Sequence, residues 1–229
     1  MTKLKPIRQE RASDAVYAAL RQAILSRVLR SGEKLDVNQL AVQLNVSLTP
    51  VRNAIHLLAA EGLIEVRPRS GTCVASVTAT DVRETFEIRR ALECLAVENA
   101  CTAITAEELA DLRDMLAVLN QPVKEDLERQ RHEHHNARFH VAILKAAGNE
   151  RLIAAYQRLN AHIQIARIHA DETGWRLRLD RERAEHVEIV DAIAVRDASR
   201  AVQAMRTHID RACESLVKAI EKKNANPEG

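Results

Sequence analysis

A short segment near residue 50 has the residue types that contact nucleic acid. The string SLTPVR, residues 47–52, begins a predicted helix with Ser47 as its N-cap and Pro50 in the first turn, where a missing N–H costs nothing. At the start of such a helix Thr49 can donate to a phosphate, and Arg52 can donate to a guanine or to phosphates. The segment therefore favours DNA binding, and a solvated helix surface is the alternative.

Four residues far apart in the chain have the types that bind a divalent metal ion. Asn136 and His140 are four positions apart in one predicted helix and so share a face, while His186 and His208 lie on later helices. Three imidazoles and one amide oxygen from three helices of a bundle can surround one ion. The chain has nine histidines, so spacing alone leaves open that these are ordinary core or surface residues.

The remaining histidines are assigned no functional role. The string QRHEHHNARFH ends at His140, and we expect its three other histidines to form a solvated stretch of their helix. We expect the others to be ordinary structural or surface residues. The first group is His132, His134 and His135, and the second is His56, His162 and His169.

Arg89 lies on an otherwise apolar helix face, because it follows Phe86 by three positions and precedes Leu92 by three. An arginine directed into a helical bundle needs a carboxylate partner. Within the chain that partner can be Glu93 or an acid of another helix.

Three helices must position the segment at 47–52. A first helix is predicted at about 12–28, with Ser13 as its N-cap. Its apolar residues recur every four positions, at Val16, Leu20, Ile24 and Val28. Asp36 can cap a short second helix, and the third helix, which Ser47 begins, ends at Gly62.

Two short β-type runs follow, at residues 63–66 and 72–77, around a basic tip at 67–71. They predict a two-stranded hairpin. Two helices joined by a tight turn and then a basic hairpin form a winged helix-turn-helix, in which the second helix enters the major groove. The predicted DNA-contacting residues are Ser47, Leu48, Thr49, Arg52, Arg69 and Gly71.

The rest of the chain is predicted to be helical to its end. Apolar stripes at spacings of three and four indicate six helices, with Thr105 and Asp197 as N-caps. Their approximate ranges are 81–102, 105–120, 123–147, 149–171, 175–195 and 197–222. Six antiparallel helices of this length form a bundle whose interior can hold a small molecule.

Composition agrees with a mainly α protein of two domains. Among 229 residues, aromatics make up 2%, and Gly (6) and Pro (5) are too scarce for the many turns of a sandwich or barrel. We expect a winged helix-turn-helix at 1–78, of which 1–11 is a loose basic arm, and a helical domain at 79–229. No apolar run is long enough for a membrane span, and no secretory signal is evident, so we expect a cytoplasmic protein.

Charge is divided unevenly between these two parts. Residues 1–78 contain 11 Lys and Arg against 6 Asp and Glu, whereas residues 79–229 contain 23 against 26. The excess of positive charge in the first part suggests a polyanionic partner for that part only. The four cysteines form no CxxC pair, so we expect neither a disulfide framework nor a cysteine zinc site.

Residues 13–78 resemble the winged-helix domain of the GntR family of bacterial transcription regulators. The resemblance rests on the string AILSRVLRSGEKLDVNQLAVQLNVSLTPVRNAIHLLAAEGLIEVRPRSGTCV. In that family the start of the recognition helix usually reads SRTPVR, so Leu48 stands where a base-contacting arginine is typical. Leucine cannot read a guanine, although it can contact a thymine methyl group. Gly71 matches the glycine at the tip of the family's wing.

Residues 79–229 resemble the FCD ligand-binding domain of the FadR-like branch of the family. The resemblance rests on the strings EIRRALECLAVENA, NARFHVAILKAAGNERL and EHVEIVDAIAVRDASRAVQAMRTHI. It implies a metal site of zinc or nickel, with Asn136 in place of the commoner aspartate. It also implies that Arg89 helps to hold an acidic effector, and the length of the domain favours the VanR-type subgroup. The implied metal ligands are Asn136, His140, His186 and His208.

The expected function is an effector-controlled transcription regulator and not an enzyme. Its partners would be double-stranded operator DNA, a small carboxylate effector and a second copy of the chain, because one helix-turn-helix reads too few base pairs. The alternatives are a helical-bundle metalloenzyme, a metal-dependent sensor of a non-acid ligand, and a purely structural DNA-binding protein. Against an enzyme, the sequence has no HExxH motif and no repeated Glu-x-x-His pair.

Overall fold

The protein is mainly helical and divides into two compact units. The computed structural model describes residues 12–26, 28–67, 71–169 and 175–225. The first unit contains the chain up to Val77, together with 164–168, and the second contains the remaining residues from Thr78 onward. This division lies one residue from the predicted boundary. No helix in the described part is long and apolar enough to cross a membrane.

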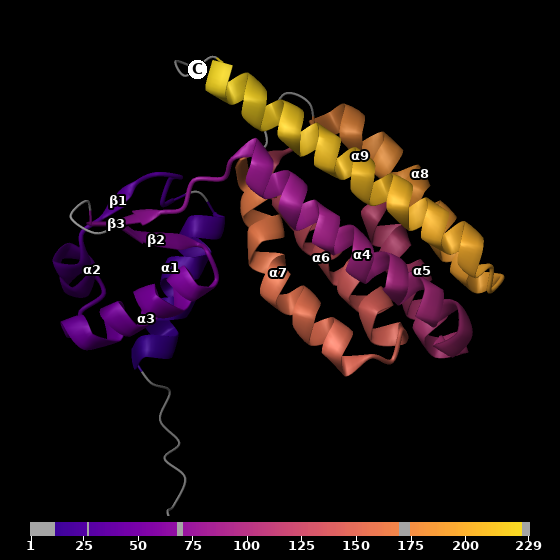
Figure 1. The fold of residues 1–229 in the computed structure, drawn as a ribbon, viewed down its shortest axis with the longest axis horizontal. Coiled ribbons are helices and arrows are strands. Elements are labelled where there is room, and N and C mark those ends of the chain that lie inside the picture. Colours follow the sequence, from indigo (N-terminus) through magenta and orange to yellow (C-terminus); the bar gives the residue numbers. More distant parts are fainter. Residues whose placement is uncertain (1–11, 27, 68–70, 170–174, 226–229) are drawn as a thin grey trace, which may run out of the picture. The chain divides into compact units, whose positions relative to one another are not determined.

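The first unit contains the predicted helix-turn-helix and wing (Figure 1). The wing is a hairpin of two antiparallel strands, and a two-residue strand that the sequence analysis missed pairs with it, so the sheet order is β1-β3-β2. Strand β1 was missed because two residues are too short to show alternation. The elements are α1 (Ala12–Leu25), β1 (Lys34–Leu35), α2 (Val37–Gln43), α3 (Leu48–Ala60), β2 (Ile64–Arg67) and β3 (Gly71–Val74).

An apolar core holds α1 against α3. Val16, Leu20 and Ile24 on α1 are buried, as the four-residue spacing predicts. Burial of each such side chain stabilises the fold by about 1.5–3 kcal/mol. Two predictions for this helix were wrong. Val28 lies beyond the end of α1 and is 73% exposed, and Ser13 is not the N-cap because Ala12 is already helical. The buried residues of α3 are Val51, Ala54, Ile55 and Leu58.

The turn between α2 and α3 fixes the start of the second helix. The Asp36 carboxylate caps α2 by accepting hydrogen bonds from the backbone N–H groups of Asn38 (2.8 Å) and Gln39 (3.1 Å). Asn45 in the turn has a left-handed φ of 52°, a conformation that asparagine tolerates better than most residues. Ser47 is the N-cap of α3, as predicted, although its side chain makes no capping hydrogen bond.

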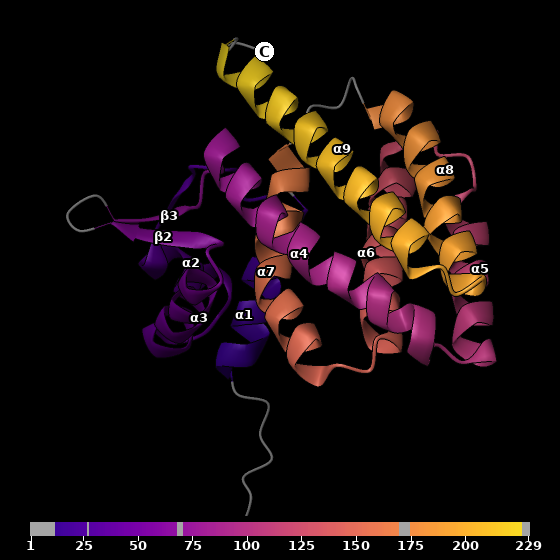
Figure 2. The same ribbon diagram turned by 45° about the vertical axis from the view of Figure 1, so that its right-hand side comes forward.

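The second unit is the predicted bundle of six helices. Two begin with complete capping boxes, formed by Thr78 with Asp81 and by Thr105 with Glu108, and each box satisfies backbone N–H groups that a helix start leaves unpaired. Helices α4 and α9 run side by side (Figures 1 and 2). The helices are α4 (Ala79–Ala103), α5 (Ala106–Leu119), α6 (Asp126–Ala146), α7 (Glu150–His169), α8 (Trp175–Ala194) and α9 (Ala198–Ala225).

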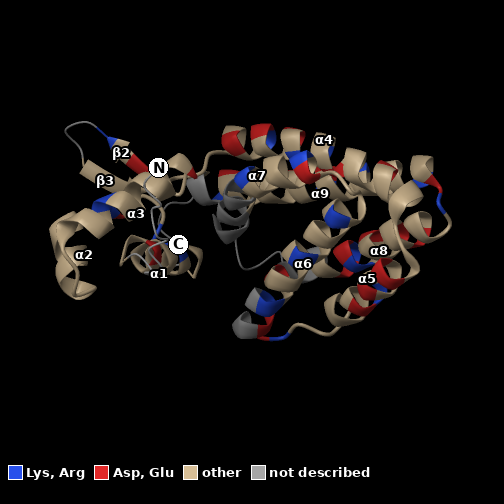
Figure 3. Cartoon of the chain, turned by 90° about the horizontal axis from the view of Figure 1, so that it is seen from below, with Lys and Arg blue, Asp and Glu red and all other residues tan. Residues whose placement is uncertain are grey.

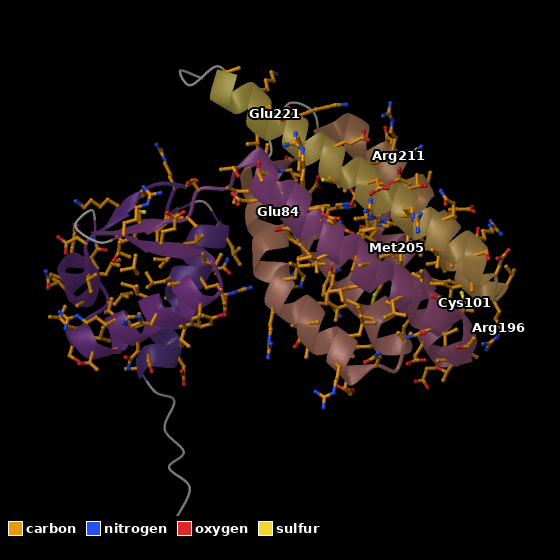
Figure 4. The ribbon with its side chains drawn as sticks, viewed as in Figure 1. Glu84, Cys101, Arg196, Met205, Arg211 and Glu221 are labelled. Carbon is orange, nitrogen blue, oxygen red and sulfur yellow. The ribbon has the colours of Figure 1, made fainter. Side chains whose placement is uncertain are left out.

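Arg196 joins the α8–α9 turn to the end of α4. Its guanidinium donates hydrogen bonds to the carbonyls of Cys101 (2.9 Å), Thr102 (2.9 Å) and Ile104 (3.3 Å), which the last turn of α4 leaves unpaired. Figure 4 labels Arg196 and Cys101 at this end of the bundle. Arg196 has a left-handed φ of 58°, so these hydrogen bonds compensate for a backbone conformation that costs a non-glycine residue about 1–2 kcal/mol.

We expect Arg196→Ala to destabilise the bundle by about 1–3 kcal/mol, because it loses the three hydrogen bonds and keeps the strained backbone. Arg196→Gly should be more stable than the alanine variant by about 1 kcal/mol, since glycine removes the strain. Chemical denaturation followed by circular dichroism measures both variants. A glycine variant that is less stable than the alanine variant would contradict this role for Arg196.

Candidate metal centre and DNA-contacting surface

Three histidines from three helices meet inside the bundle. His140 on α6, His186 on α8 and His208 on α9 are each at most 1% exposed, and one ring nitrogen of each lies within 4.8 Å of the other two. The Nε2 atoms of His140 and His208 are 3.3 Å apart. Two nitrogens bound to one zinc ion at about 2.1 Å can be at most about 4.2 Å apart, so this pair has a suitable separation.

Two of the three imidazoles are oriented by carboxylates. Nδ1 of His140 contacts Glu93 on α4, and Nδ1 of His208 lies 3.0 Å from Oε2 of Glu185 on α8. Because a carboxylate accepts, each Nδ1 carries the proton and donates it, and each Nε2 keeps its lone pair. The two lone pairs therefore lie on the side of the rings where the histidines meet. The sequence predicted Glu93 only as a possible partner of Arg89, not of His140, and it predicted no role for Glu185.

The donor set fits a bound cation. Asn136 Nδ2 donates to Glu182 Oε1 at 2.6 Å, which leaves Asn136 Oδ1 buried with no hydrogen-bond partner among the described residues. Neither ring nitrogen of His186 has such a partner within the same residues. Buried polar atoms of this kind normally cost stability unless something satisfies them. A divalent ion held by imidazole nitrogens and an amide oxygen would satisfy Asn136 Oδ1 and one ring nitrogen of His186.

Arg89 has the internal partner that one alternative of the sequence analysis required. Its Nε donates to Glu93 Oε1 at 2.6 Å, and both side chains are at most 1% exposed. Its Nη2 lies 3.1 Å from His140 Nε2 and donates to it, since a guanidinium cannot accept. Nη1 is buried with no hydrogen-bond partner in the described part of the chain. The Nη1 group therefore remains available to donate a hydrogen bond to another acceptor at the edge of the cluster.

The cluster shifts the ionisation of its members. Burial, and then the neighbouring His140, lowers the pKa of His208 to about 3. Burial likewise holds the pKa of His186 well below its usual value. Burial by itself raises the pKa of Glu93, but the charges of Arg89 and His140 outweigh it and keep that pKa well below its usual range. The imidazoles of His186 and His208 are thus neutral, the form that binds metals, and Glu93 is an ionised carboxylate.

The prediction of a solvated histidine stretch was wrong at His132. This residue is only 7% exposed, whereas His134 is exposed and His135 is half-buried. His132 precedes Asn136 by one helical turn on α6 and lowers the pKa of His186, so it lies at the border of the cluster. The four-residue spacing 132-136-140 was the sequence signal for this placement. His162 and His169 have side chains outside the described residues.

The start of α3 presents a polar surface. Thr49 and Arg52 are exposed, while Val51 on the opposite side is fully buried, as the sequence predicts. Asn53 and His56 are exposed on the same side of α3, and the sequence analysis assigned them no role. Asn53 follows Thr49 by four positions and His56 follows Arg52 by four, and this spacing was the signal that could have identified them. All four side-chain types can donate to phosphates or base edges.

The other predicted DNA-contacting residues differ in what surrounds them. Leu48 lines a groove of about 590 Å³ with α2 residues that include Val42, which is 80% exposed. Ser47 is exposed at the edge of the same groove. Gly71 has a φ of 93°, and a Cβ there would lie 3.2 Å from Lys34 Cε, so the hairpin favours glycine. Arg69 lies outside the described residues.

Comparisons with known proteins identify the family. Residues 12–74 match the bacterial regulatory proteins of the gntR family, and residues 84–211 match the FCD domain. The chain is 30% identical to the uncharacterized HTH-type transcriptional regulator YdhC of Bacillus subtilis, over 92% of this chain and 93% of that protein. The chain therefore belongs to the GntR family of DNA-binding transcription regulators and carries an FCD domain.

Solved structures support the same fold. The chain is similar to E. coli McbR/YncC, with a TM-score of 0.74 at 22% identity, over 92% of this chain and 99% of that one. It is also similar to the metal-free FCD domain of TM0439, with a TM-score of 0.54 at 23% identity, over 65% and 99% of the two chains. The predicted FadR-like fold is confirmed, whereas the VanR-type subgroup stays a prediction.

We expect the metal-free protein, kept in a chelator, to lose stability as the pH falls from 7 to 5.5. The folded pKa of His208 is about 3, and the unfolded value is about 6.5, so within this range the unfolded chain binds more protons. The free energy of unfolding therefore falls with the pH. His208→Gln should flatten this dependence, and His134→Gln, at an exposed position, should not. If the free energy of unfolding changes equally with pH in all three proteins, the buried imidazole of His208 does not cause the pH dependence.

Proposed function

We propose that this transcription regulator binds its operator with an affinity controlled by a small organic acid at a metal site in the bundle. The observation that carries the proposal is the buried cluster of His140, His186 and His208, in which both ring nitrogens of His186 and the Oδ1 of the neighbouring Asn136 have no hydrogen-bond partner among the described residues. Unsatisfied polar atoms at the centre of a bundle are costly, and a bound ion would account for them.

Zinc or nickel suits the donor set. Imidazole nitrogens favour these borderline ions, whereas magnesium and calcium prefer oxygen ligands. Asn136 contributes a neutral oxygen where an aspartate would bring a charge, so the site should bind its ion less tightly than an aspartate version. When bound, the ion supplies positive charge and open positions that carboxylate oxygens can occupy.

Arg89 is the residue that we propose contacts the effector. Nε and Nη2 already bind Glu93 and His140, but Nη1 is buried and has no described hydrogen-bond partner. A carboxylate at the cluster would satisfy Nη1 in a dry environment, where a charged hydrogen bond is strong. Phe86 packs against the guanidinium, 5.1 Å from its ring centroid, and helps to hold it in place.

DNA binding is proposed to involve two copies of the chain. One exposed face of α3 covers only a few base pairs, so two recognition helices on an inverted repeat are needed for useful specificity. If the effector favours one arrangement of the two DNA-binding units, it changes operator affinity by the same coupling energy, typically about 1–3 kcal/mol. The relatives' names as transcription regulators support this function over a metalloenzyme.

Arg52→Ala should weaken binding to the specific operator by about 1–3 kcal/mol, because an exposed arginine at this position can donate to a guanine or to phosphates. The matched control is Arg113→Ala, which removes an exposed arginine from α5 in the bundle. Fluorescence anisotropy with duplex DNA measures both. If Arg52→Ala binds as tightly as the control, α3 is not the recognition helix.

His186→Ala should abolish most metal binding, because this imidazole has no other described partner. Asn136→Asp should tighten binding by adding a negative charge to the donor set. His134→Ala, at an exposed position on α6, should leave metal content unchanged and is the control. Elemental analysis of each purified protein gives metal per chain. A His186→Ala protein with wild-type metal content would rule out the site.

A further inference from the structure

We infer that Glu185 is a positioning residue for the metal ligand His208 and connects it to a groove on the bundle surface. The inference rests on the proposed metal site. Glu185 directly precedes His186 on α8, yet its carboxylate reaches the histidine of the neighbouring helix. Oε2 accepts from Nδ1 of His208 at 3.0 Å, and Oε1 accepts from Nη1 of Arg211 at 2.7 Å.

Glu185 controls which nitrogen of His208 is free to bind. A carboxylate at Nδ1 holds the proton there, keeps the lone pair on Nε2 and increases the basicity of the ring. Nε2 of His208 is the atom that lies 3.3 Å from Nε2 of His140. Loss of the Glu185 charge therefore weakens a metal ligand without removing any ligand.

The bundle contains two series in which an arginine contacts a carboxylate and the carboxylate contacts a histidine. One series is fully buried, and the other reaches the surface. His140 is supported by Glu93 and Arg89, and all three side chains are at most 1% exposed. His208 is supported by Glu185, whose side chain is 11% exposed, and by Arg211, whose side chain is 58% exposed. The first arginine–carboxylate–histidine series is enclosed, whereas the second reaches the surface.

The second series ends in a groove between α8 and α9. The groove has a volume of about 480 Å³, and its walls include both Glu185 and Arg211, the latter labelled in Figure 4. Charged residues of both signs lie along α8 (Figure 3). Because Arg211 is the outermost member, a change in its pairing at the surface is transmitted through Glu185 to His208.

The same groove supplies a matched control. Glu188 follows Glu185 by three positions on α8 and also lines the groove. Its carboxylate pairs with Arg200 through two hydrogen bonds, from Nε (2.7 Å) and Nη2 (2.9 Å), and within the described part of the chain it makes no hydrogen bond to a histidine. Replacing either glutamate by glutamine removes one negative charge from the same surface, but only one replacement affects a metal ligand.

The test compares Glu185→Gln, Glu188→Gln and the wild type as full chains. The zinc dissociation constant is measured by competition with a chromophoric chelator, and the environment of the ion is followed in the absorption spectrum of the cobalt(II) form. We expect Glu185→Gln to weaken zinc binding about 10- to 100-fold and to shift the cobalt spectrum. Glu188→Gln should match the wild type in both. Arg211→Gln, which leaves the carboxylate in place, should give a smaller loss than Glu185→Gln.

The outcomes separate this inference from the proposed metal site. If the wild type binds zinc, His186→Ala does not, and Glu185→Gln binds as the wild type does, the metal site stands and the role of Glu185 is overturned. Equal losses in Glu185→Gln and Glu188→Gln would also overturn it, since surface charge alone would explain them. A wild type that binds no zinc overturns both. If Glu185→Gln does not fold, a wild-type affinity in Arg211→Gln overturns the link to the groove.

Discussion

The desolvation of polar groups at the centre of the bundle is the constraint on which the rest of the structure depends. Every buried polar or charged side chain in the described part of the chain belongs to this bundle. Burying such groups costs free energy unless each finds a partner. Arg89 donates to Glu93 through Nε, but its Nη1, both ring nitrogens of His186 and the Asn136 amide oxygen have no hydrogen-bond partner among the described residues. The cation that we propose would satisfy lone pairs of His186 and Asn136.

The buried polar cluster requires that the helices which supply its residues keep fixed relative positions. His140, His186 and His208 come from α6, α8 and α9, and Glu93 reaches the cluster from α4, so four helices must keep their relative positions. Arg196 fixes the α8–α9 turn to the end of α4, and the capping box at Thr78 fixes the start of α4. Features far from the cluster thus maintain distances within it. The same rigidity would allow a small change at the cluster to be passed along whole helices.

Much of this fold could be predicted from the sequence, because helix periodicity and capping residues act locally. The six bundle helices, the Asp36 and Thr105 caps and the hairpin all follow from such patterns. The histidine cluster is different, since His140, His186 and His208 are distant in the chain, and spacing alone left them open as ordinary residues until the family resemblance favoured a metal site. Glu185 and the contact of Glu93 with His140 were missed because a charged residue on a helix usually faces solvent. His132 was misjudged for the same reason, although its spacing from Asn136 placed it on the buried face.

The central claim is that one metal ion is held by the three buried histidines. X-ray absorption at the metal edge of the zinc- or nickel-loaded full chain tests it most directly, because scattering from imidazole rings is distinguishable from that of simple oxygen ligands. The account predicts about three imidazole nitrogens at about 2.0–2.1 Å for zinc, with oxygen completing the shell. A shell without imidazole, or one that is unchanged when His186 is replaced by alanine, would contradict it.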